Sequence, residues 1–406
     1  MSKGFNQQFF IDNRKTILSK SKCDLVIVSA NTAVQRNGDS PYLFRQDSNF
    51  WYLCGVAKPD FVLVITKNES FLIAPRLTAT QVIFDPHESG DDLKKASGVS
   101  AIYENVKGWL KLRSHLDDSQ RVGMTSALNI KSWGITPNPS QEKLIKKIKR
   151  ISKTEVINIL KPLAHMRMIK QPQEVRAIAR AIDITTDSLK QVAAGIEIQK
   201  YQNEYEIEAE LSYNFRKSGA QGHAFSPVIA GGFNSTIPHY QSNNASLKPG
   251  SVVVMDVGAE VNNYAADITR TIVYGKSTKR QQQVIESVAR VQQKAILRLK
   301  PGVTLHESEL LVEQDTGVEL KKLGLISKVN RKNIRRFYGH AASHMIGLDP
   351  HDLADYSMPL AKNMVLTVEP GIYIPEENIG VRIEDDILIT ENGYEILSKN
   401  LPVSLS

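Results

Sequence analysis

The first third of the chain alternates short apolar runs with stretches of helical periodicity. Three apolar runs, Asp24–Ala30, Phe61–Thr66 and Phe71–Pro75, have the length and apolar character of buried strands. The polar residues Lys67–Ser70 separate the last two runs and are typical of a hairpin turn. This alternation predicts an α/β domain in the first part of the chain.

The pattern changes around residues 160–169. Pro172 then stands where the first turn of a helix is expected, and helical periodicity continues to Ala194. The chain has 406 residues, which is more than one ordinary hydrophobic core supports. We therefore expect two domains, one over residues 1–162 and one over residues 163–406.

The second domain contains one pattern twice. Leu247–Asp256 and Leu360–Glu369 each begin with leucine, pass through a polar turn and continue as an apolar strand to a carboxylate nine residues on. A turn with glycine and a second strand follow in both cases, and the second strand brings another acid, Asp267 or Glu384. The repeat predicts two matched strand pairs, related by pseudo-two-fold symmetry, that face each other across one site.

These four acids lie next to buried apolar strands. A carboxylate in such surroundings is costly unless it is neutralised, paired or bound to metal. Four of them close together would repel one another strongly, and divalent cations between them would remove that repulsion. The repeat therefore predicts a metal site.

Three of the nine histidines, His340, His344 and His351, lie within twelve positions. The glycines and the Asp-Pro pair around them interrupt helical continuity, so His344 and His351 are expected on strands or loops that line a cleft. Oxygen ligands with a single imidazole favour Mn²⁺, with Co²⁺, Fe²⁺ or Zn²⁺ as alternatives. Two ions about 3.5–4 Å apart would share carboxylates and a bridging water, which would become a hydroxide nucleophile near neutral pH.

The charge balance raises the alternative of nucleic-acid binding, because 51 basic and 43 acidic residues give a net charge of +8. The densest basic stretches, Lys143–Lys153 and Arg331–Arg336, place isoleucine between the charges at helical intervals. That spacing is typical of the solvated face of an amphipathic helix. We expect no nucleic-acid partner.

Membrane insertion and secretion are not expected either. No apolar run approaches the roughly 20 residues that cross a bilayer, and the first 22 residues offer no signal-type apolar stretch. Cys23 and Cys54 are too few for a disulfide framework or a cysteine metal site, which favours a reducing compartment. The expected location is the cytoplasm.

Several segments resemble the aminopeptidase P and prolidase family. They are MDVGAEVNNYAADITRT at 255–271, GHAASHMIGLDPHD at 339–352, TVEPGIYI at 367–374 and GVRIEDD at 380–386. FRQDSNFWYLCGVAKPDFVLVI, at 44–65, resembles the first domain of that family. The resemblance implies an α+β protein in which a creatinase-type α/β domain precedes a metallopeptidase domain. That second domain would have the pita-bread fold, with its pseudo-two-fold internal repeat.

The resemblance also implies a ligand set for two metal ions. Its members are Asp256, Asp267, His344, Glu369 and Glu384. Asp267 and Glu384 would bridge the ions, Asp256 would bind one of them, and His344 with Glu369 would bind the other.

Further site residues follow from the same resemblance. His239 matches a histidine that steadies the scissile amide and its tetrahedral intermediate, and His351 matches one that holds the substrate backbone. Glu369 matches the proton shuttle between the water and the leaving nitrogen. The residues that match the lining of the proline pocket are His340, Tyr373 and Arg382. His223 is expected to be structural or secondary.

The implied activity is that of an Xaa-Pro aminopeptidase, which releases the N-terminal residue from peptides with proline second and acts as a homodimer or higher oligomer. A prolidase, which cleaves Xaa-Pro dipeptides, is the nearest alternative, and Arg382 could serve either enzyme. A methionine aminopeptidase and a metal-free peptide-binding module are less favoured alternatives. Two departures stand out: Ala341 replaces the glycine usual after the first histidine of the HG-x-SH pattern, and the loop at 375–380 is short.

Overall fold

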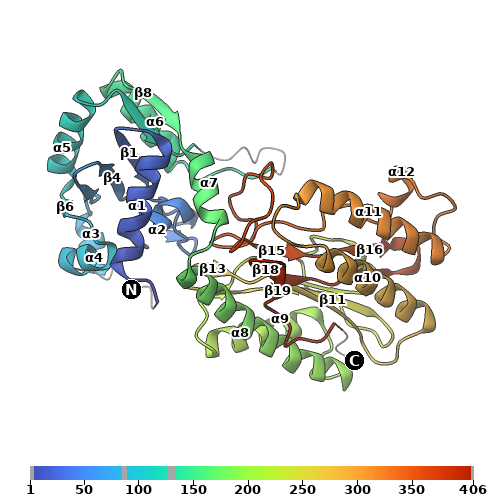
Figure 1. Ribbon diagram of the computed structural model, residues 1–406. Helices are drawn as coiled ribbons and strands as arrows, with labels where there is room; N and C mark the ends of the chain where they lie inside the picture. Colours follow the sequence, from blue (N-terminus) through green and yellow to red (C-terminus); the bar gives the residue numbers. More distant parts are fainter. Residues whose placement is uncertain (1–3, 85–88, 127–133, 404–406) are drawn as a thin grey trace. The chain divides into compact units, whose positions relative to one another are not determined.

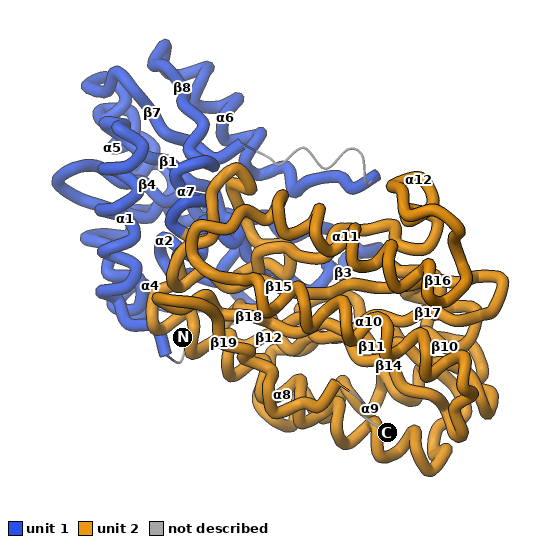
Figure 2. Tube along the Cα trace, turned by 45° about the vertical axis from the view of Figure 1, so that its right-hand side comes forward, with its two compact units in different colours: residues 1–166 blue, residues 167–406 orange. Residues whose placement is uncertain are grey.

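The structure is a computed structural model that describes residues 4–84, 89–126 and 134–403. It divides into two compact units, unit 1 (Met1–Met166) and unit 2 (Arg167–Ser406), which Figure 2 colours separately. The boundary expected between residues 162 and 163 lies inside helix α7, Leu160–Met168. It stays a prediction.

Unit 1 is built on a mixed sheet with the strand order β6-β5-β4-β1-β7-β8 among the described residues (Figure 1). Its strands are β1 (Leu25–Ser29), β4 (Val62–Thr66), β5 (Ser70–Ile73), β6 (Ala101–Tyr103), β7 (Arg121–Met124) and β8 (Glu155–Asn158). A separate small hairpin is formed by β2 (Gln35–Asn37) and β3 (Ser40–Pro41). The helices that precede α7 are α1 (Gln7–Ser21), α2 (Ser48–Cys54), α3 (Ala79–Phe84), α4 (Gly90–Ser97), α5 (Asn105–Asp117) and α6 (Ser140–Ile151).

The three strands predicted for unit 1 are β1, β4 and β5. β4 and β5 form the expected antiparallel hairpin, in which the Thr66 N–H donates to the Glu69 carbonyl over 2.8 Å. Helix α6 has the predicted amphipathic character, since Leu144 and Ile148 are buried in the unit 1 core while its lysines face outward. The basic stretch of α6 is therefore a solvated face.

Unit 2 contains two three-stranded antiparallel sheets that correspond to the two copies of the repeat. The first, β10-β11-β14, consists of Val228–Gly231, Val252–Val257 and Ile268–Val273. The second, β15-β18-β19, consists of Val365–Val368, Asp385–Ile389 and Tyr394–Ile396. Smaller sheets are β13-β12-β9 (Tyr264–Ala265, Ala259–Val261, Gly222–His223) and β16-β17 (Gly371–Ile374, Ile379–Arg382).

The helices of unit 2 cover the two halves separately. They are α8 (Pro172–Glu197), α9 (Glu204–Lys217), α10 (Lys279–Leu297), α11 (Leu305–Lys322) and α12 (Arg331–Ile334), with short 3₁₀ turns η2 (Gly232–Thr236) and η3 (Pro375–Glu377). α8 packs along β12, β13 and β14, whereas α10 packs along β15, β16 and β17. As predicted, α8 begins at Pro172, and Gln171 with Glu174 forms a capping box there.

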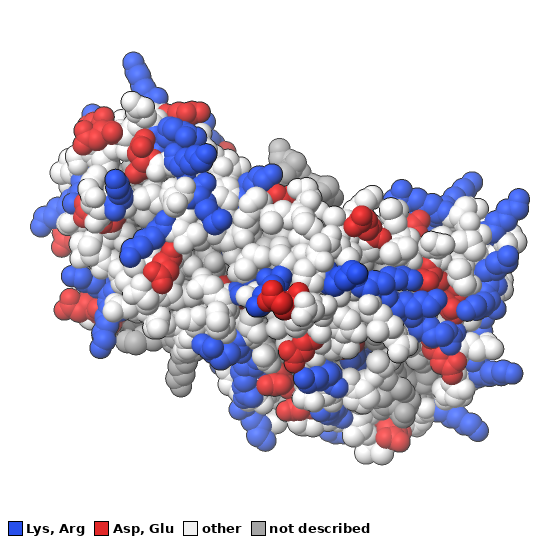
Figure 3. Space-filling model, in the orientation of Figure 1, with Lys and Arg blue, Asp and Glu red and all other residues white. Residues whose placement is uncertain are grey.

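The net positive charge is concentrated over α10 to α12. Residues 276–336 contain 14 Lys and Arg against 6 Asp and Glu, an excess equal to that of the whole chain. Figure 3 shows basic side chains gathered over these helices. Many of them are paired, as Arg290 is with Glu319 and Arg298 with Asp315, which fits an ordinary charged surface. None of the helices in the described ranges combines the length and apolar character needed to cross a bilayer.

Candidate metal centre

The four acids of the repeat lie at corresponding places in the two halves of unit 2. Asp256 lies in β11, and Asp267 immediately precedes β14. Glu369 immediately follows β15, and Glu384 immediately precedes β18. The strand pairs β11–β14 and β15–β18 are both antiparallel, so each pair brings its two acids to one end.

His344 lies on a loop beside the second strand pair. Its N–H donates to the Thr367 hydroxyl over 3.2 Å, and the Thr367 N–H donates back to the His344 carbonyl over 2.9 Å. These two bonds fix the residue next to β15. The expectation that His344 lies on a strand or loop, and not on a helix face, is therefore confirmed.

The five side chains converge. Ligand atoms of Asp267, His344 and Glu384 lie within 4.8 Å of one another. The His344 Nε2 is 3.3 Å from a carboxylate oxygen of Glu369 and 3.7 Å from one of Asp267. Asp256 also lies close to the group, because its charge raises the pKa of both Asp267 and Glu384, after burial and one other neighbouring acid in each case.

The residues present fit a cationic group. Burial and the neighbouring acids hold the pKa values of Asp267 and Glu384 well above their ordinary range. Asp256 Oδ1 and Glu384 Oε1 are buried oxygens that accept no hydrogen bond from the described residues. A divalent cation would reduce the repulsion among the buried acids and would bind the two carboxylate oxygens that accept no hydrogen bond.

A hydrogen-bonded chain links the expected proline pocket to the acids. The His340 Nδ1 lies 2.8 Å from the Ala341 carbonyl and therefore carries the proton, so the Tyr373 hydroxyl donates to His340 Nε2 over 2.7 Å. That hydroxyl accepts from Arg382 Nη1 over 2.9 Å, and Arg382 Nη2 donates to Asp256 over 2.5 Å. Burial lowers the pKa of His340 and raises that of Tyr373 to about 12, so both rings are neutral near pH 7.

His351 and His239 lie near the same group. The His351 ring stacks on that of His344, with 4.0 Å between ring centroids and 9° between planes. Burial, then the charges of His344 and His239, lowers the pKa of His351 to about 4. His239 is exposed and follows η2, and the carbonyl of the preceding Pro238 faces Arg382 Nη2 at 3.5 Å. The structure thus brings both histidines to the ligand cluster.

Two residues that contact the cluster were not predicted from the sequence. The Thr269 hydroxyl donates to a carboxylate oxygen of Glu384 over 2.7 Å, and Asp386 accepts from the Asp267 N–H over 3.1 Å. Burial raises the pKa of Asp386 to about 8. The doubled acid in the segment IEDD was the only signal for Asp386. His223, expected to be structural or secondary, pairs with the Ser212 hydroxyl at 2.8 Å.

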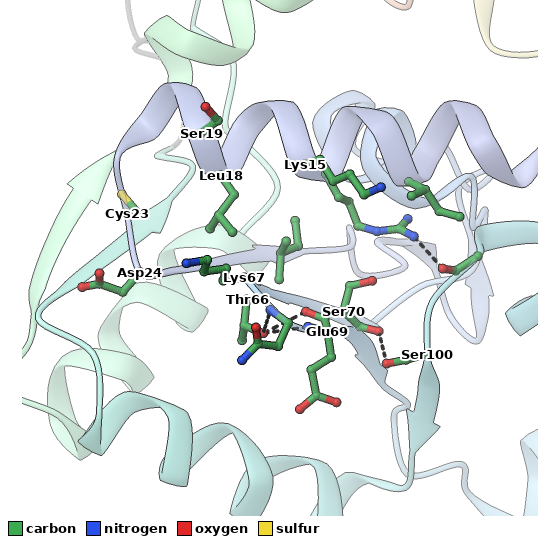
Figure 4. A pocket seen from close by; sticks show the side chains of 15 residues that line it. Lys15, Leu18, Ser19, Cys23, Asp24, Thr66, Lys67, Glu69, Ser70 and Ser100 are labelled. Carbon is green, nitrogen blue, oxygen red and sulfur yellow. Dashed lines mark hydrogen bonds between the residues drawn. The ribbon is translucent and has the colours of Figure 1, made fainter.

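Unit 1 has a cavity of about 740 Å³ beside helix α1 and the β4–β5 turn (Figure 4). Its polar groups are engaged in local bonds. The Thr66 hydroxyl bonds the Glu69 carbonyl, the Ser100 hydroxyl donates to the Ser70 carbonyl over 2.7 Å, and the Arg14 guanidinium donates to backbone carbonyls. Nothing in this cavity resembles the ligand cluster of unit 2.

Comparison with known proteins agrees with this geometry. The model of metallopeptidase family M24 matches residues 176–391, and that of the aminopeptidase P N-terminal domain matches residues 10–122. Human Xaa-Pro aminopeptidase 3 is 30% identical over 94% of this chain and 79% of its own length. A Pyrococcus horikoshii Xaa-Pro dipeptidase is 29% identical over 90% of this chain and 94% of its own length.

The solved structures confirm the predicted architecture. Aminopeptidase P from Escherichia coli superimposes with a TM-score of 0.86 at 29% identity, over 98% of this chain and 96% of that one. The α+β arrangement of a creatinase-type domain followed by a pita-bread domain is therefore correct. The chain belongs to metallopeptidase family M24, and its N-terminal part is an aminopeptidase P N-terminal domain.

Proposed function

We propose that this protein is an Xaa-Pro aminopeptidase that hydrolyses the bond between the first residue of a peptide and a proline in second position. The observation that carries the proposal is the convergence of five ligand-type side chains beside the chain formed by His340, Tyr373 and Arg382. The five ligand-type side chains are suited to holding metal ions that activate water. The chain of His340, Tyr373 and Arg382 is suited to contacting the rigid, uncharged ring of proline. Similarity to relatives such as human Xaa-Pro aminopeptidase 3 supports the proposal.

The ligand cluster is proposed to hold two divalent ions, Mn²⁺ foremost, with Co²⁺, Fe²⁺ or Zn²⁺ as alternatives. The ligands are Asp256, Asp267, His344, Glu369 and Glu384. Asp267 and Glu384, the two acids whose pKa values are raised, are the proposed bridging ligands. When bound, such ions supply a water acidified to a nucleophile near neutral pH.

Glu369 is the proposed proton carrier. Although burial opposes its ionisation, the hydrogen bond with His344 and the nearby charges of His344, His340 and Arg382 hold its pKa below the ordinary value, so it is a carboxylate that can accept a proton from water. The scissile amide nitrogen belongs to proline and has no N–H. It must be protonated as it leaves, and Glu369 can return the proton to it.

His239 and His351 are proposed to contact the substrate. An imidazole N–H can donate a hydrogen bond to a carbonyl oxygen on which negative charge develops during the reaction. His239 would steady the scissile amide and its tetrahedral intermediate, and His351 would hold the substrate backbone. His340, Tyr373 and Arg382 would line the proline pocket.

A prolidase is the alternative function, and the Pyrococcus horikoshii relative carries that name. Such an enzyme must bind the carboxylate of its dipeptide substrate. Here Arg382 is buried, and its guanidinium already donates to Asp256, Tyr373 and Thr269. Its charge is therefore committed within the site, which favours the aminopeptidase.

A peptide panel tests the proposal. Protein stripped with a chelator and reloaded with Mn²⁺ should release glycine from Gly-Pro-Ala, with little release from Gly-Ala-Ala. Cleavage of the dipeptide Gly-Pro with no cleavage of Gly-Pro-Ala would establish the alternative. Titration of the stripped protein with Mn²⁺ should reach two ions per chain.

Two further parts of the proposal concern the state of the protein. We place it in the cytoplasm, because Cys23 and Cys54 are free and buried, as suits a reducing compartment. We expect a homodimer or higher oligomer, which light scattering of the purified protein would reveal.

A further inference from the structure

His239 lies on a long connection with little regular structure. After β10 the chain forms η2, passes through His239 and reaches β11 only at Val252. A histidine that must face a reacting carbonyl has to be held to within roughly 0.5 Å. Exposed loops seldom achieve that by themselves. The structure therefore needs a group that fastens this connection.

Glu204 is placed to do so. It is the first residue of α9, and its side chain is fully buried. One carboxylate oxygen accepts from the Gly231 N–H over 2.8 Å and from the Asn234 side chain over 3.0 Å. The other accepts from the Tyr240 hydroxyl over 2.8 Å and from the Ala245 N–H over 2.9 Å.

These four bonds join the start of the connection, at Gly231, to its middle, at Asn234 and Tyr240, and to Ala245 farther along. All four donors are neutral groups, so the carboxylate serves as a hydrogen-bonding hub and not as half of an ion pair. Its position at the start of α9 suits a negative charge, because the N-terminal end of a helix is positive. The backbone of Glu204 adds a fifth bond, from its N–H to the Ala245 carbonyl over 3.0 Å.

Tyr240 connects this hub to the site. It directly follows His239, and its half-buried hydroxyl bonds Glu204 on the inner side of the connection. With the Tyr240 side chain fixed inward, the backbone of the adjacent residue has little freedom to turn. The exposed imidazole of His239 is thereby held where its charge acts on His351, while the carbonyl of the preceding Pro238 faces Arg382.

We propose that Glu204 is a positioning residue of the reaction, which holds His239 in place through the hydroxyl of Tyr240. This inference rests on the proposed function, because it concerns how His239 meets the scissile amide. Neither Glu204 nor Tyr240 contacts the substrate in this scheme. Both act through His239.

A double-mutant cycle on the full-length, Mn²⁺-loaded protein tests the inference. Tyr240→Phe removes a single hydroxyl and should lower kcat on Gly-Pro-Ala about tenfold, the effect of losing one hydrogen bond of about 1.4 kcal/mol. KM should change less than about twofold, because the interaction is needed for the intermediate and not for binding. In a His239→Ala background the same substitution should have no further effect on kcat.

Tyr274→Phe is the matched control. The Tyr274 hydroxyl bonds the Tyr201 carbonyl over 2.5 Å and the Gln199 carbonyl over 3.1 Å, and neither partner belongs to the connection. It should leave kcat unchanged while lowering stability about as much as Tyr240→Phe does. Glu204→Gln, where an amide replaces one accepting oxygen, should lower kcat more than Tyr240→Phe.

The outcomes separate the two proposals. A wild-type protein that does not cleave Gly-Pro-Ala overturns the proposed function, and the inference with it. An active wild type in which Tyr240→Phe lowers kcat equally with and without His239 overturns the inference alone, because the hydroxyl would then be merely structural. A kcat effect that disappears in the His239→Ala background supports it, whether or not Glu204→Gln folds.

Discussion

The two halves of unit 2 present their acids from the same topology but with different side chains. The first half uses aspartates: Asp256 inside β11 and Asp267 beside β14. The second half uses glutamates, and Glu369 stands one residue beyond the end of β15. A glutamate is longer by one methylene, so it can reach a shared centre from a backbone position farther away. The comparison teaches that an imperfect repeat can bring acids of different length to one centre from corresponding strand ends.

Each half also supports the acid of the other. Thr269 and Asp386 stand two residues after Asp267 and Glu384, so they correspond in the repeat. Thr269 donates its hydroxyl to Glu384, and Asp386 accepts from the Asp267 backbone. The two contacts occupy corresponding positions in the repeat but differ in chemistry. Thr269 is a neutral hydrogen-bond donor, whereas Asp386 is a buried acid. Substitutions can show which differences matter.

The largest effect is expected from Glu369→Gln. It removes a ligand charge and the proposed proton carrier, so turnover should fall by roughly 10²–10⁴ without unfolding. Asp256→Asn, its counterpart in the first half, removes a ligand charge that also pairs with Arg382 but no proton carrier, and it should mainly weaken Mn²⁺ binding. Turnover at saturating Mn²⁺ and metal content would be measured together. Near-normal turnover of Glu369→Gln would remove that residue from the mechanism.

Arg270→Met should cause the largest loss of stability. The buried Arg270 of β14 reaches the second half, where it donates to Asp385 over 2.7 Å and to the carbonyls of Glu384 and Leu401. Its counterpart in the repeat is the apolar Ile387, which cannot form equivalent hydrogen bonds. Arg270 therefore links the first half to the second without a matching link from the second half to the first. Removing one partner of such a buried pair should cost about 3–5 kcal/mol of unfolding free energy, measured with urea.

Lys399→Met is the control for that experiment, because Lys399 forms an exposed pair with Glu395. It should change the free energy of unfolding by less than about 1 kcal/mol. Equal losses of unfolding free energy in the two variants would show that the buried contacts of Arg270 do not stabilise the fold.

The helices that cover the two halves predict a difference in pH dependence. α8 places the buried Glu174 against the Tyr264 hydroxyl, and burial raises the pKa of Glu174 from 4.5 to about 7. α10 places the neutral Gln292 against Asp385 instead. Because folded Glu174 holds its proton more tightly than the unfolded chain does, the contribution of Glu174 to stability is largest below pH 4.5. This contribution decreases as the pH rises from 4.5 to about 7, and above about pH 7 it no longer changes.

Glu174→Gln isolates this contribution. The wild type should lose up to about 3 kcal/mol more unfolding free energy than the variant between pH 4.5 and 7.5. Urea unfolding of both proteins across that range provides the measurement. Parallel pH profiles would contradict the raised pKa.

The smallest effect is expected from Thr269→Val. It removes the hydroxyl that Glu384 accepts, at a cost of about 1 kcal/mol, so kcat/KM should fall less than about tenfold. Thr367→Val, which removes an acceptor for the His344 N–H, should have an effect of similar size. A much larger loss in only one variant would show that the two halves contribute unequally.

Local patterns in the sequence were sufficient for much of the fold. Apolar runs predicted β1, β4 and β5, and Pro172 marked the start of α8, because strand burial and helix capping depend on residues close together in the chain. The doubled strand pattern led to all four acids, the histidine cluster included His344, and the family resemblance identified His344 as the ligand. The domain boundary was placed from a change of pattern around residues 160–169 and stays a prediction, since residues 162 and 163 lie inside α7.

Only the tertiary structure decided which groups support the site. Arg270 and Leu401 are 131 positions apart, Thr269 and Glu384 are 115 apart, and Glu204 and Tyr240 are 36 apart. No periodicity connects residues at such separations, and a buried threonine or glutamate looks the same in the sequence whatever it contacts. Their roles follow from which strand ends and loops the packing of unit 2 brings together, and that packing is a property of the whole core.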